Sequence, residues 1–284
     1  MSKKRIYSYL TYLLSAFSLS LWFFYFSSVS GAFSISFFDV GNGDGFLIQT
    51  PENFKIVIDG GPTDKILEKI GIRNPFSKKE IDLLVLTHPH EDHVYGSLEI
   101  VRNFKVKNVL VTGVEHNNKT YKEFLSNAKD YGAEIIHASY GQTFKLGETE
   151  VSVLYPFYSL EGKKDNNINE TSIVLKLVYG KFECLFLGDL EEKVGLEMLR
   201  QGVDLSADVV KVSHQGSKNG AQNLPFFLER VNPKIAIISV GKNSFGHPHK
   251  KTLDRLSSFG ADILRTDIAG DITIKSDGEK FWMD

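Results

Sequence analysis

The sequence has 284 residues, of which 42% are hydrophobic and 24% charged, a composition ordinary for a folded globular protein and not for a disordered or fibrous one. Three basic residues and no acidic residue precede Asp39, so the rest of the chain carries 30 of the 33 Lys and Arg residues and all 35 Asp and Glu residues. This formal charge of −5 excludes the broad basic surface of a generic nucleic-acid-binding protein. The single cysteine, Cys184, excludes an intrachain disulfide and a cysteine zinc cluster.

The first 32 residues differ from the rest, because three basic residues precede the uncharged run from Ile6 to Phe26. As a helix, these 21 residues would span about 31 Å at 1.5 Å per residue, which matches a hydrocarbon core of about 30 Å. Small residues between Ser28 and Ala32 also suit cleavage of a signal peptide. We therefore expect residues 1–32 to be either a transmembrane anchor or a signal peptide, with the following domain outside the cytoplasm in both cases.

From Phe33 onward, short apolar runs alternate with amphipathic segments of helical length, which predicts one α/β domain over residues 33–284. The polar segment Ser159–Asn169 is expected to be a loop. The predicted strands are Phe33–Asp39, Phe46–Thr50, Lys55–Asp59, Ile81–Thr87, Val109–Thr112, Ser172–Val178, Phe182–Leu187, Asp208–Val212, Ile235–Val240 and Ala261–Arg265. The predicted helices are His93–Asn103, Lys119–Tyr131, Glu191–Gln201, Pro225–Val231 and Lys250–Phe259.

The strongest chemical signal is the segment THPHEDHVYG, which follows a predicted buried strand. It places His88, His90, Asp92 and His93 within six positions of one another. Neutral imidazole and carboxylate groups together suit Zn, Mn or Fe better than a metal selected by thiolates. In an extended chain His88 and His90 point the same way, because side chains two positions apart lie on one face. The segment therefore predicts a metal site at the end of this strand.

Three further polar residues close apolar strands: Asp59 ends KIVID, Asp189 follows ECLFLG, and His214 follows ADVVKVS. A single Asp at such a position is commonly a turn former or a helix cap. However, ligands of open α/β sheets bind where the carboxyl ends of strands meet. We therefore expect these three residues to join the histidine cluster in one shared site.

These residues and their flanking motifs resemble the metallo-β-lactamase superfamily and, within it, the extracellular hydrolase domain of ComEC-type competence proteins. Phosphorylcholine esterases of bacterial surfaces are similar over the same motifs. In chain order these are FDVGNGDGFLI, IDGG, THPHEDHVYGS, NETSIVLKL, FLGDLE, DVVKVSHQGS and PKIAIISVGKNSFGHPH, and the resemblance runs from Ile35 to Ile274. It implies an αββα sandwich, in which two mixed sheets are flanked by helices and the site lies along one edge between the sheets. The N-terminal hydrophobic helix would precede this fold.

The resemblance also implies a two-metal site. Its metal ligands would be His88, His90, Asp92, His93, Asp189 and His214. Asp189 would bridge two divalent ions, zinc or manganese, with His88 and His90 on the first ion and the other three ligands on the second. A hydroxide held between the ions would be the nucleophile. We expect Asp92, Asp189 and His247 to be the catalytic residues.

Five more residues are expected behind the metal ligands or at the substrate: Asp59, Asp44, Ser217, Lys218 and His249. Asp59 would orient a ligand histidine from behind. Asp44 lies in the glycine-rich loop DVGNGDG, whose backbone N–H groups would approach the substrate. Ser217 and Lys218 would line the mouth of the site. His249, together with His247, would bind the phosphate or protonate the leaving group.

Two positions depart from the superfamily's pattern. The usual third histidine, expected before the strand at Ser172, is replaced by the NETS motif, which would leave one metal with fewer protein ligands. The common H-H-G-S motif reads His214-Gln215-Gly216-Ser217 in this chain. The missing second imidazole is not expected to be a metal ligand.

The sequence thus predicts an extracytoplasmic phosphodiesterase or nuclease that hydrolyses DNA. Because the domain is negatively charged, a polyanion would have to be held by metal ions and by local patches, for which the candidates are Lys218, Lys242, Lys250 and Lys251. Two alternatives stay open: a cell-surface phosphoesterase for a small or polymeric phosphodiester such as phosphorylcholine, and an anchored binding protein without activity. Residues 1–32 indicate the membrane as a partner, whereas no feature of the sequence indicates a protein partner.

Overall fold

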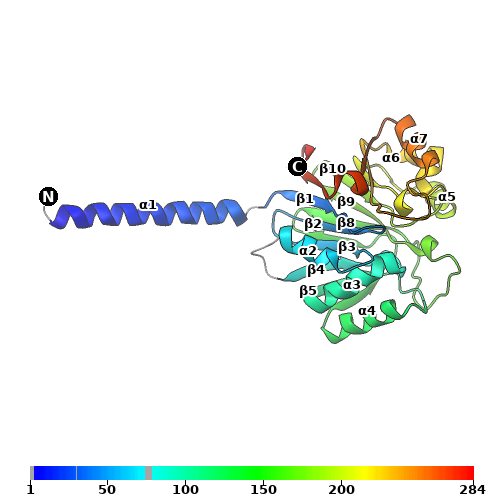
Figure 1. Ribbon diagram of the computed structural model, residues 1–284, viewed down its shortest axis with the longest axis horizontal. Coiled ribbons are helices and arrows are strands. Elements are labelled where there is room, and N and C mark those ends of the chain that lie inside the picture. Colours follow the sequence, from blue (N-terminus) through cyan, green and yellow to red (C-terminus); the bar gives the residue numbers. More distant parts are fainter. Residues whose placement is uncertain (1–2, 30, 74–78) are drawn as a thin grey trace.

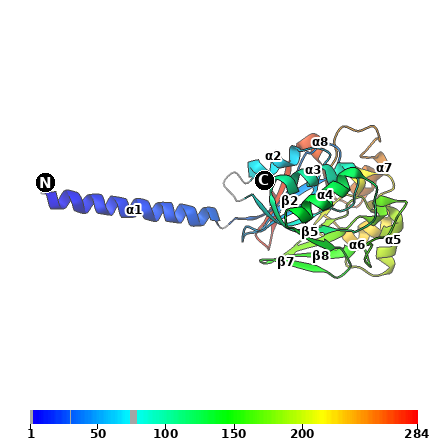
Figure 2. The same cartoon turned by 90° about the horizontal axis from the view of Figure 1, so that it is seen from below.

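A computed structural model describes residues 3–29, 31–73 and 79–284. Its first element is helix α1 (Lys3–Val29), which projects away from the folded body (Figures 1 and 2). The side chains of Leu13, Leu14 and Phe17 on this helix are exposed. Among the described residues, no helix is both long enough and apolar enough to cross a membrane. The membrane anchor and the signal peptide both stay predictions.

The folded body is built on an 8-stranded sheet and a 7-stranded sheet. The first sheet has the order β15 (Phe281–Met283), β14 (Ile272–Ser276), β1 (Phe33–Phe37), β2 (Gly45–Gln49), β3 (Lys55–Gly60), β4 (Glu80–Val85), β5 (Lys105–Val111) and β6 (Glu134–His137). The second has the order β13 (Asp262–Arg265), β12 (Ile235–Ile238), β11 (Val209–Lys211), β10 (Phe182–Phe186), β9 (Val174–Tyr179), β8 (Thr149–Tyr155) and β7 (Thr143–Leu146). Both sheets are mixed, since β3 to β6 and β10 to β13 run parallel while the other neighbours pair antiparallel.

Helices cover the outer face of each sheet, on opposite sides of the molecule (Figure 1). Those on the first sheet are α2 (Lys65–Arg73), α3 (Glu91–Asn103) and α4 (Lys119–Asp130). Those on the second are α5 (Glu192–Arg200), α6 (Pro225–Val231) and α7 (Lys250–Ser258), and the short α8 (Thr266–Ala269) follows β13. The αββα sandwich of two mixed sheets flanked by helices is thus confirmed.

The strands are apolar on both faces because each sheet is covered on both sides. On β3, Ile56 and Ile58 point into the core between the two sheets, while Val57 points into the core beneath α2 and α3. The core between the sheets is rich in aromatic rings, and those of Phe37 and Phe186 stack across it at 6.0 Å. This two-sided burial explains why runs such as KIVID and ECLFL lack the alternation of a half-exposed strand.

The predicted strands and helices all correspond to elements of the structure, and the polar segment Ser159–Asn169 contains no strand. Two helices, α2 and the short α8, and five strands, β6, β7, β8, β14 and β15, were not predicted from the sequence. The five strands lie at the ends of the sheets. β15 and β14 form one end of the first sheet and β6 forms its other end, while β8 and β7 form one end of the second sheet. Edge strands are covered less completely, so their apolar pattern is weaker.

Helix α3 crosses β3 at unusually close range, and two glycines make this possible. A Cβ atom on Gly96 would lie 1.9 Å from the carbonyl oxygen of Gly60, and one on Gly60 would lie 2.0 Å from the backbone nitrogen of Ser97. The first turn of the same helix carries Asp92 and His93. The glycine contact therefore sets the position from which these two side chains extend.

We expect Gly96→Ala to lower the free energy of unfolding by about 1–3 kcal/mol, because the added methyl group must push α3 away from β3. Gly71→Ala in α2 is the matched control, since nothing lies within 4 Å of a Cβ atom there. It should be neutral, or stabilise by up to about 1 kcal/mol through helix propensity. Denaturant unfolding of both variants measures the difference, and equal values would contradict the close crossing.

Candidate metal centre

The predicted metal ligands come from three segments that meet at one edge of the sandwich. β4 leads to the first two histidines, and the next two ligands begin α3, while β10 and β11 lead to the remaining carboxylate and imidazole. β4, β10 and β11 each pair with a parallel neighbour, so their carboxyl ends form shared edges where polar side chains gather. The ligands gathered in this way are His88, His90, Asp92, His93, Asp189 and His214.

The Asp189 carboxylate lies in the middle of this cluster. Its Oδ2 atom is 3.5 Å from Nε2 of His93, 3.7 Å from Nε2 of His214 and 3.9 Å from Nε2 of His88. One ligand atom each from His88, His93 and Asp189 lies within 4.8 Å of the other two, and all three residues are buried. One carboxylate oxygen therefore faces three imidazole nitrogens, as a group that bridges metal ions would.

Two predicted ligands lie at the rim of this triad. His90 Nδ1 is 3.1 Å from His88 Nε2, and Asp92 Oδ2 is 3.8 Å from His93 Nε2. The Asp92 side chain is 31% exposed, so it can reach an ion or a solvent molecule on the open side. The six predicted ligands are thus side by side, while their division between two ions stays a prediction.

Asp59 holds His93 in place from behind. Its Oδ2 atom is 2.8 Å from His93 Nδ1 and accepts a hydrogen bond from the Thr87 hydroxyl at 2.7 Å. Its Oδ1 atom accepts from the Thr87 backbone N–H at 2.8 Å. With Nδ1 of the imidazole engaged, Nε2 is the nitrogen left facing Asp189. By such a contact, a carboxylate behind a metal-binding histidine fixes the tautomer and the orientation of its ring.

The sequence analysis missed Lys211, which is fully buried beneath the site. Its ammonium group forms an ion pair with Asp44, donates to the Gly188 carbonyl at 3.1 Å, and lies 4.0 Å from Asp189 Oδ1. The detectable signal was a lysine inside the apolar strand ADVVKV. A charge in such a run must be paired when it is buried.

Asp44 lies behind the metal ligands, which is one of the two places expected for it. It is 0% exposed, and its carboxylate lies 4.0 Å from His93 Nδ1 as well as against Lys211. Asp44 therefore acts behind the ligands, and the reason is the lysine that draws it inward.

The charges buried at this point indicate a bound cation. Asp44, Asp59 and Asp189 are at most 1% exposed, and among the described residues they are offset by the single ammonium group of Lys211. Burying unbalanced carboxylates is costly. His93 Nε2 is also buried without a hydrogen-bond partner among the described residues. This donor set of imidazole and carboxylate fits a divalent metal ion.

The pKa values reflect the same arrangement. Burial lowers the pKa of the His88 imidazole well below its ordinary value, and nearby His93 adds to the effect, so His88 is neutral as a ligand must be. Burial opposes the charged form of His93, but the carboxylates of Asp189 and Asp59 outweigh it and raise the pKa of His93 well above its ordinary value. Burial likewise raises the pKa of Asp44 to about 7 against the pull of Lys211. Without an ion, protons on His93 and on part of the Asp44 carboxyl groups thus reduce the net negative charge of the cluster.

The NETS motif and Gln215 lie on the His214 side of the centre. The Asn169 amide is 3.3 Å from His214 Nδ1, and Ser172 Oγ is 3.4 Å from His88 Nδ1 and accepts from the backbone N–H of Asp189 at 3.1 Å. The Gln215 amide donates to Asp189 Oδ2 at 3.4 Å. At both positions where the sequence departs from the superfamily's pattern, the NETS motif and Gln215, polar side chains therefore contact the predicted ligands His88, Asp189 and His214.

The other predicted substrate residues are placed differently from one another. The His247 ring lies 5.3 Å from that of His214, and its buried Nδ1 has no hydrogen-bond partner among the described residues.

The loop after His214 contains two more of these residues. Lys218 is exposed, whereas Ser217 is 5% exposed and its carbonyl accepts hydrogen bonds from the side chains of Asn223 and Thr252. Ser217 thus helps to hold the loop that follows His214, and its role at the mouth of the site stays a prediction. The His249 backbone N–H donates to the Gly216 carbonyl at 2.9 Å, which ties the start of α7 to the His214 loop.

Comparison with known proteins adds independent evidence. Residues 38–242 match the sequence model of the metallo-beta-lactamase superfamily. The chain is 28% identical over 270 residues to ComE operon protein 3 of Bacillus subtilis (strain 168), covering 88% of this chain and 34% of that protein. It is 26% identical over 240 residues to competence protein ComA of Neisseria gonorrhoeae, covering 84% of this chain and 31% of that protein. The chain thus spans about a third of the length of these relatives.

A solved structure has the same fold. The metallo-beta-lactamase fold protein YhfI from Bacillus subtilis superposes with a TM-score of 0.56 at 10% sequence identity, covering 89% of this chain and 100% of that protein. At this identity the likeness concerns the fold alone. The ligand cluster described above must therefore be judged on its own geometry.

We expect Asp189→Asn to reduce both bound metal and turnover, since one carboxylate oxygen faces three imidazoles. The loss should exceed the roughly 10- to 100-fold effect of removing a group behind a ligand. Asp262→Asn, an exposed residue of β13, is the matched control. Elemental analysis gives the metal content, and wild-type metal content with wild-type turnover in the Asp189 variant would rule out its central role.

Proposed function

Because the chain belongs to the metallo-beta-lactamase superfamily and has the fold of its metal-dependent hydrolases, we propose that it hydrolyses phosphodiesters and that DNA is its substrate. The observation that carries the proposal is the buried Asp189 carboxylate facing three imidazole nitrogens within 3.9 Å. Two ions bound to such a cluster supply Lewis acidity and lower the pKa of a bound water, which suits attack on phosphorus.

The chain's own residues would hold and orient the reacting groups. His88, His93 and His214 would bind the ions together with Asp189, and Asp59 would keep Nε2 of His93 directed at them. Ions of zinc or manganese fit this donor set equally well. Water is excluded from the buried side of the centre, where the three carboxylates and Lys211 are packed. The substrate can therefore approach from the side of His90, Asp92 and His214, which are partly exposed.

His247 is proposed to meet the leaving oxygen. Its ring lies next to that of His214 on the partly exposed side, at 5.3 Å, and its Nδ1 atom is unpartnered among the described residues. The His247 backbone is held by Asn243, whose Oδ1 accepts from the His247 N–H at 3.0 Å. An imidazole in this position can hold a proton for the oxygen that departs.

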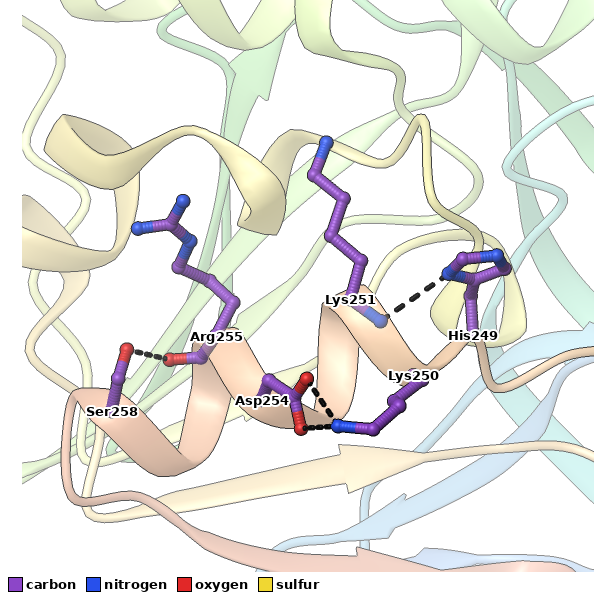
Figure 3. Close-up of a pocket in the computed structure, with 6 residues that line it drawn as sticks. All are labelled: His249, Lys250, Lys251, Asp254, Arg255 and Ser258. Carbon is purple, nitrogen blue, oxygen red and sulfur yellow. Dashed lines mark hydrogen bonds and ion pairs between the residues drawn. The ribbon is translucent and has the colours of Figure 1, made fainter.

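A basic groove next to the centre supports a polyanionic substrate. A cavity of about 520 Å³ lies along α7 and is lined by His249, Lys250, Lys251, Asp254, Arg255 and Ser258 (Figure 3). The side chains of Lys251 and Arg255 extend to the same side of the helix. Lys250 pairs with Asp254 at 2.6 Å, and Lys251 forms a longer contact with Glu192 at 3.4 Å. Arg255 was not part of the patch predicted from the sequence. Ammonium and guanidinium groups in a row suit the phosphates of a nucleic-acid backbone.

The relatives' names support DNA as the polymer. Two proteins named for competence match most of this chain, although the chain spans only about a third of their length. Their shared segment contains the metal centre described above. A role for this chain in competence is part of the proposal, and so is its placement outside the cytoplasm.

Hydrolysis of linear DNA and of bis(p-nitrophenyl) phosphate by the zinc- or manganese-loaded protein tests the proposal. We expect alanine at Lys218, Lys242, Lys250 and Lys251 to weaken DNA cleavage at least about tenfold at 0.15 M salt, because each lost phosphate contact removes a salt-dependent share of the affinity. Hydrolysis of the small diester should stay within about twofold, since it makes few such contacts.

The matched control for this variant has alanine at Lys105, Lys145, Lys181 and Lys280, which are exposed and lie outside the groove. It should cleave both substrates like the wild type. Equal losses on the two substrates in the variant at Lys218, Lys242, Lys250 and Lys251, or no DNA cleavage by the wild type with either metal, would favour a small phosphodiester such as phosphorylcholine. No hydrolysis of any diester would favour a binding protein.

Residues 1–32 are proposed to direct the domain out of the cytoplasm, since basic residues precede an uncharged run. When these residues are fused to alkaline phosphatase, which is active only after export, we expect enzyme activity in intact bacterial cells. The same fusion with Leu13 and Phe17 replaced by Lys is the control and should lose the signal, because charges in the apolar run prevent insertion. An inactive wild-type fusion would refute the extracytoplasmic location.

A further inference from the structure

A second cavity lies next to α4. Its volume is about 880 Å³, and its walls come from the segment 111–117, from α4, from β6 and from the loop 161–166. His116 belongs to this wall, and its ring lies 6.3 Å from that of the predicted metal ligand His90. A ligand that reaches the centre can therefore extend into this cavity, which is named the α4 cavity below.

The α4 cavity has an apolar floor and polar walls. Val114, Leu125 and Ile135 supply apolar surface, and Tyr121 lines the cavity while being only 3% exposed. The Tyr121 hydroxyl is buried and has no hydrogen-bond partner among the described residues. A buried hydroxyl without a partner is costly, so its presence indicates a missing acceptor. Burial raises the pKa of Tyr121 to about 12, so the hydroxyl keeps its proton and can donate.

The charges around the cavity narrow the class of ligand. Lys122, Lys129 and Lys164 line it together with Glu115, Glu161 and Asp165, so its formal charges balance. Tyr121 is the one Phe, Tyr or Trp side chain in this lining, whereas a quaternary ammonium group such as choline prefers a cage of several aromatic rings. Acidic partners are nearby, since Lys164 lies 3.6 Å from Glu115. The lining therefore favours neither an anion nor a cation, and it suits a flat, uncharged ring with polar edges.

We propose that the α4 cavity binds the base of the nucleotide whose phosphate lies at the metal centre. The apolar floor would contact the ring face, and the Tyr121 hydroxyl would donate to a carbonyl or ring nitrogen at its edge. The volume is within the range of about 300–1,000 Å³ that is usual for small-ligand pockets. The inference rests on the proposed phosphodiesterase function and specifies its substrate as a nucleic acid.

Binding of thymidine 5′-monophosphate and of inorganic phosphate to the metal-loaded protein, measured by calorimetry, tests this inference without turnover. Both ligands carry the phosphate, but only the first carries a base, so the wild type should bind the nucleotide at least about tenfold more tightly. Leu125→Trp should remove this advantage by filling the cavity. Tyr121→Phe should weaken nucleotide binding by roughly 3- to 10-fold through the lost hydrogen bond, and both variants should bind inorganic phosphate like the wild type.

Tyr131→Phe, which changes an exposed tyrosine just after α4, is the matched control and should leave both affinities unchanged. Equal affinity of the wild type for the two ligands, or unchanged nucleotide affinity in Leu125→Trp, would overturn the inference. Should Leu125→Trp fail to fold, Tyr121→Phe decides, because it alters neither volume nor packing. Hydrolysis of bis(p-nitrophenyl) phosphate by the wild type tests the phosphodiesterase proposal separately, since that substrate has no base.

Discussion

The structure depends on the burial of three carboxylates at one point, those of Asp44, Asp59 and Asp189. Each would be expensive to keep ionised in the interior without a compensating charge or several hydrogen bonds. Lys211 offsets one charge, and Thr87 and His93 satisfy the oxygens of Asp59. The remaining negative charge is what a divalent ion would balance, so the same electrostatic constraint explains both the buried lysine and the imidazoles that face Asp189.

The two sheets make this concentration of charge possible. Asp59 and the histidine segment follow β3 and β4 of the first sheet, while Asp189 and His214 follow β10 and β11 of the second. Neither sheet alone would hold a carboxylate among several imidazoles. The aromatic core between the sheets, with Phe37 and Phe186 stacked across it, keeps these two edges in register. Packing far from the site therefore sets distances within it.

Two different surfaces lie near this centre. The groove along α7 presents the cations of Lys251 and Arg255, whereas the α4 cavity presents an apolar floor with the Tyr121 hydroxyl. A charged chain and a flat ring are the two parts of a nucleotide. A small phosphodiester without a base would leave the α4 cavity unused. The pairing of these surfaces is the strongest structural support for a nucleic-acid substrate.

The amino-acid sequence by itself determined the class of the fold and singled out the candidate ligands of the metal centre. Apolar runs such as ECLFL show which segments are buried strands, and His88, His90, Asp92 and His93 are neighbours along the chain, so local spacing was enough to identify them. Only the tertiary structure decided the roles of Lys211 and Asp44. Lys211 and Asp44 are 167 positions apart, and no local pattern records which distant charge will be buried against which. Pairing across such distances is settled by the packing of the two sheets, because the energy of a buried charge depends on the neighbours that this packing brings to it.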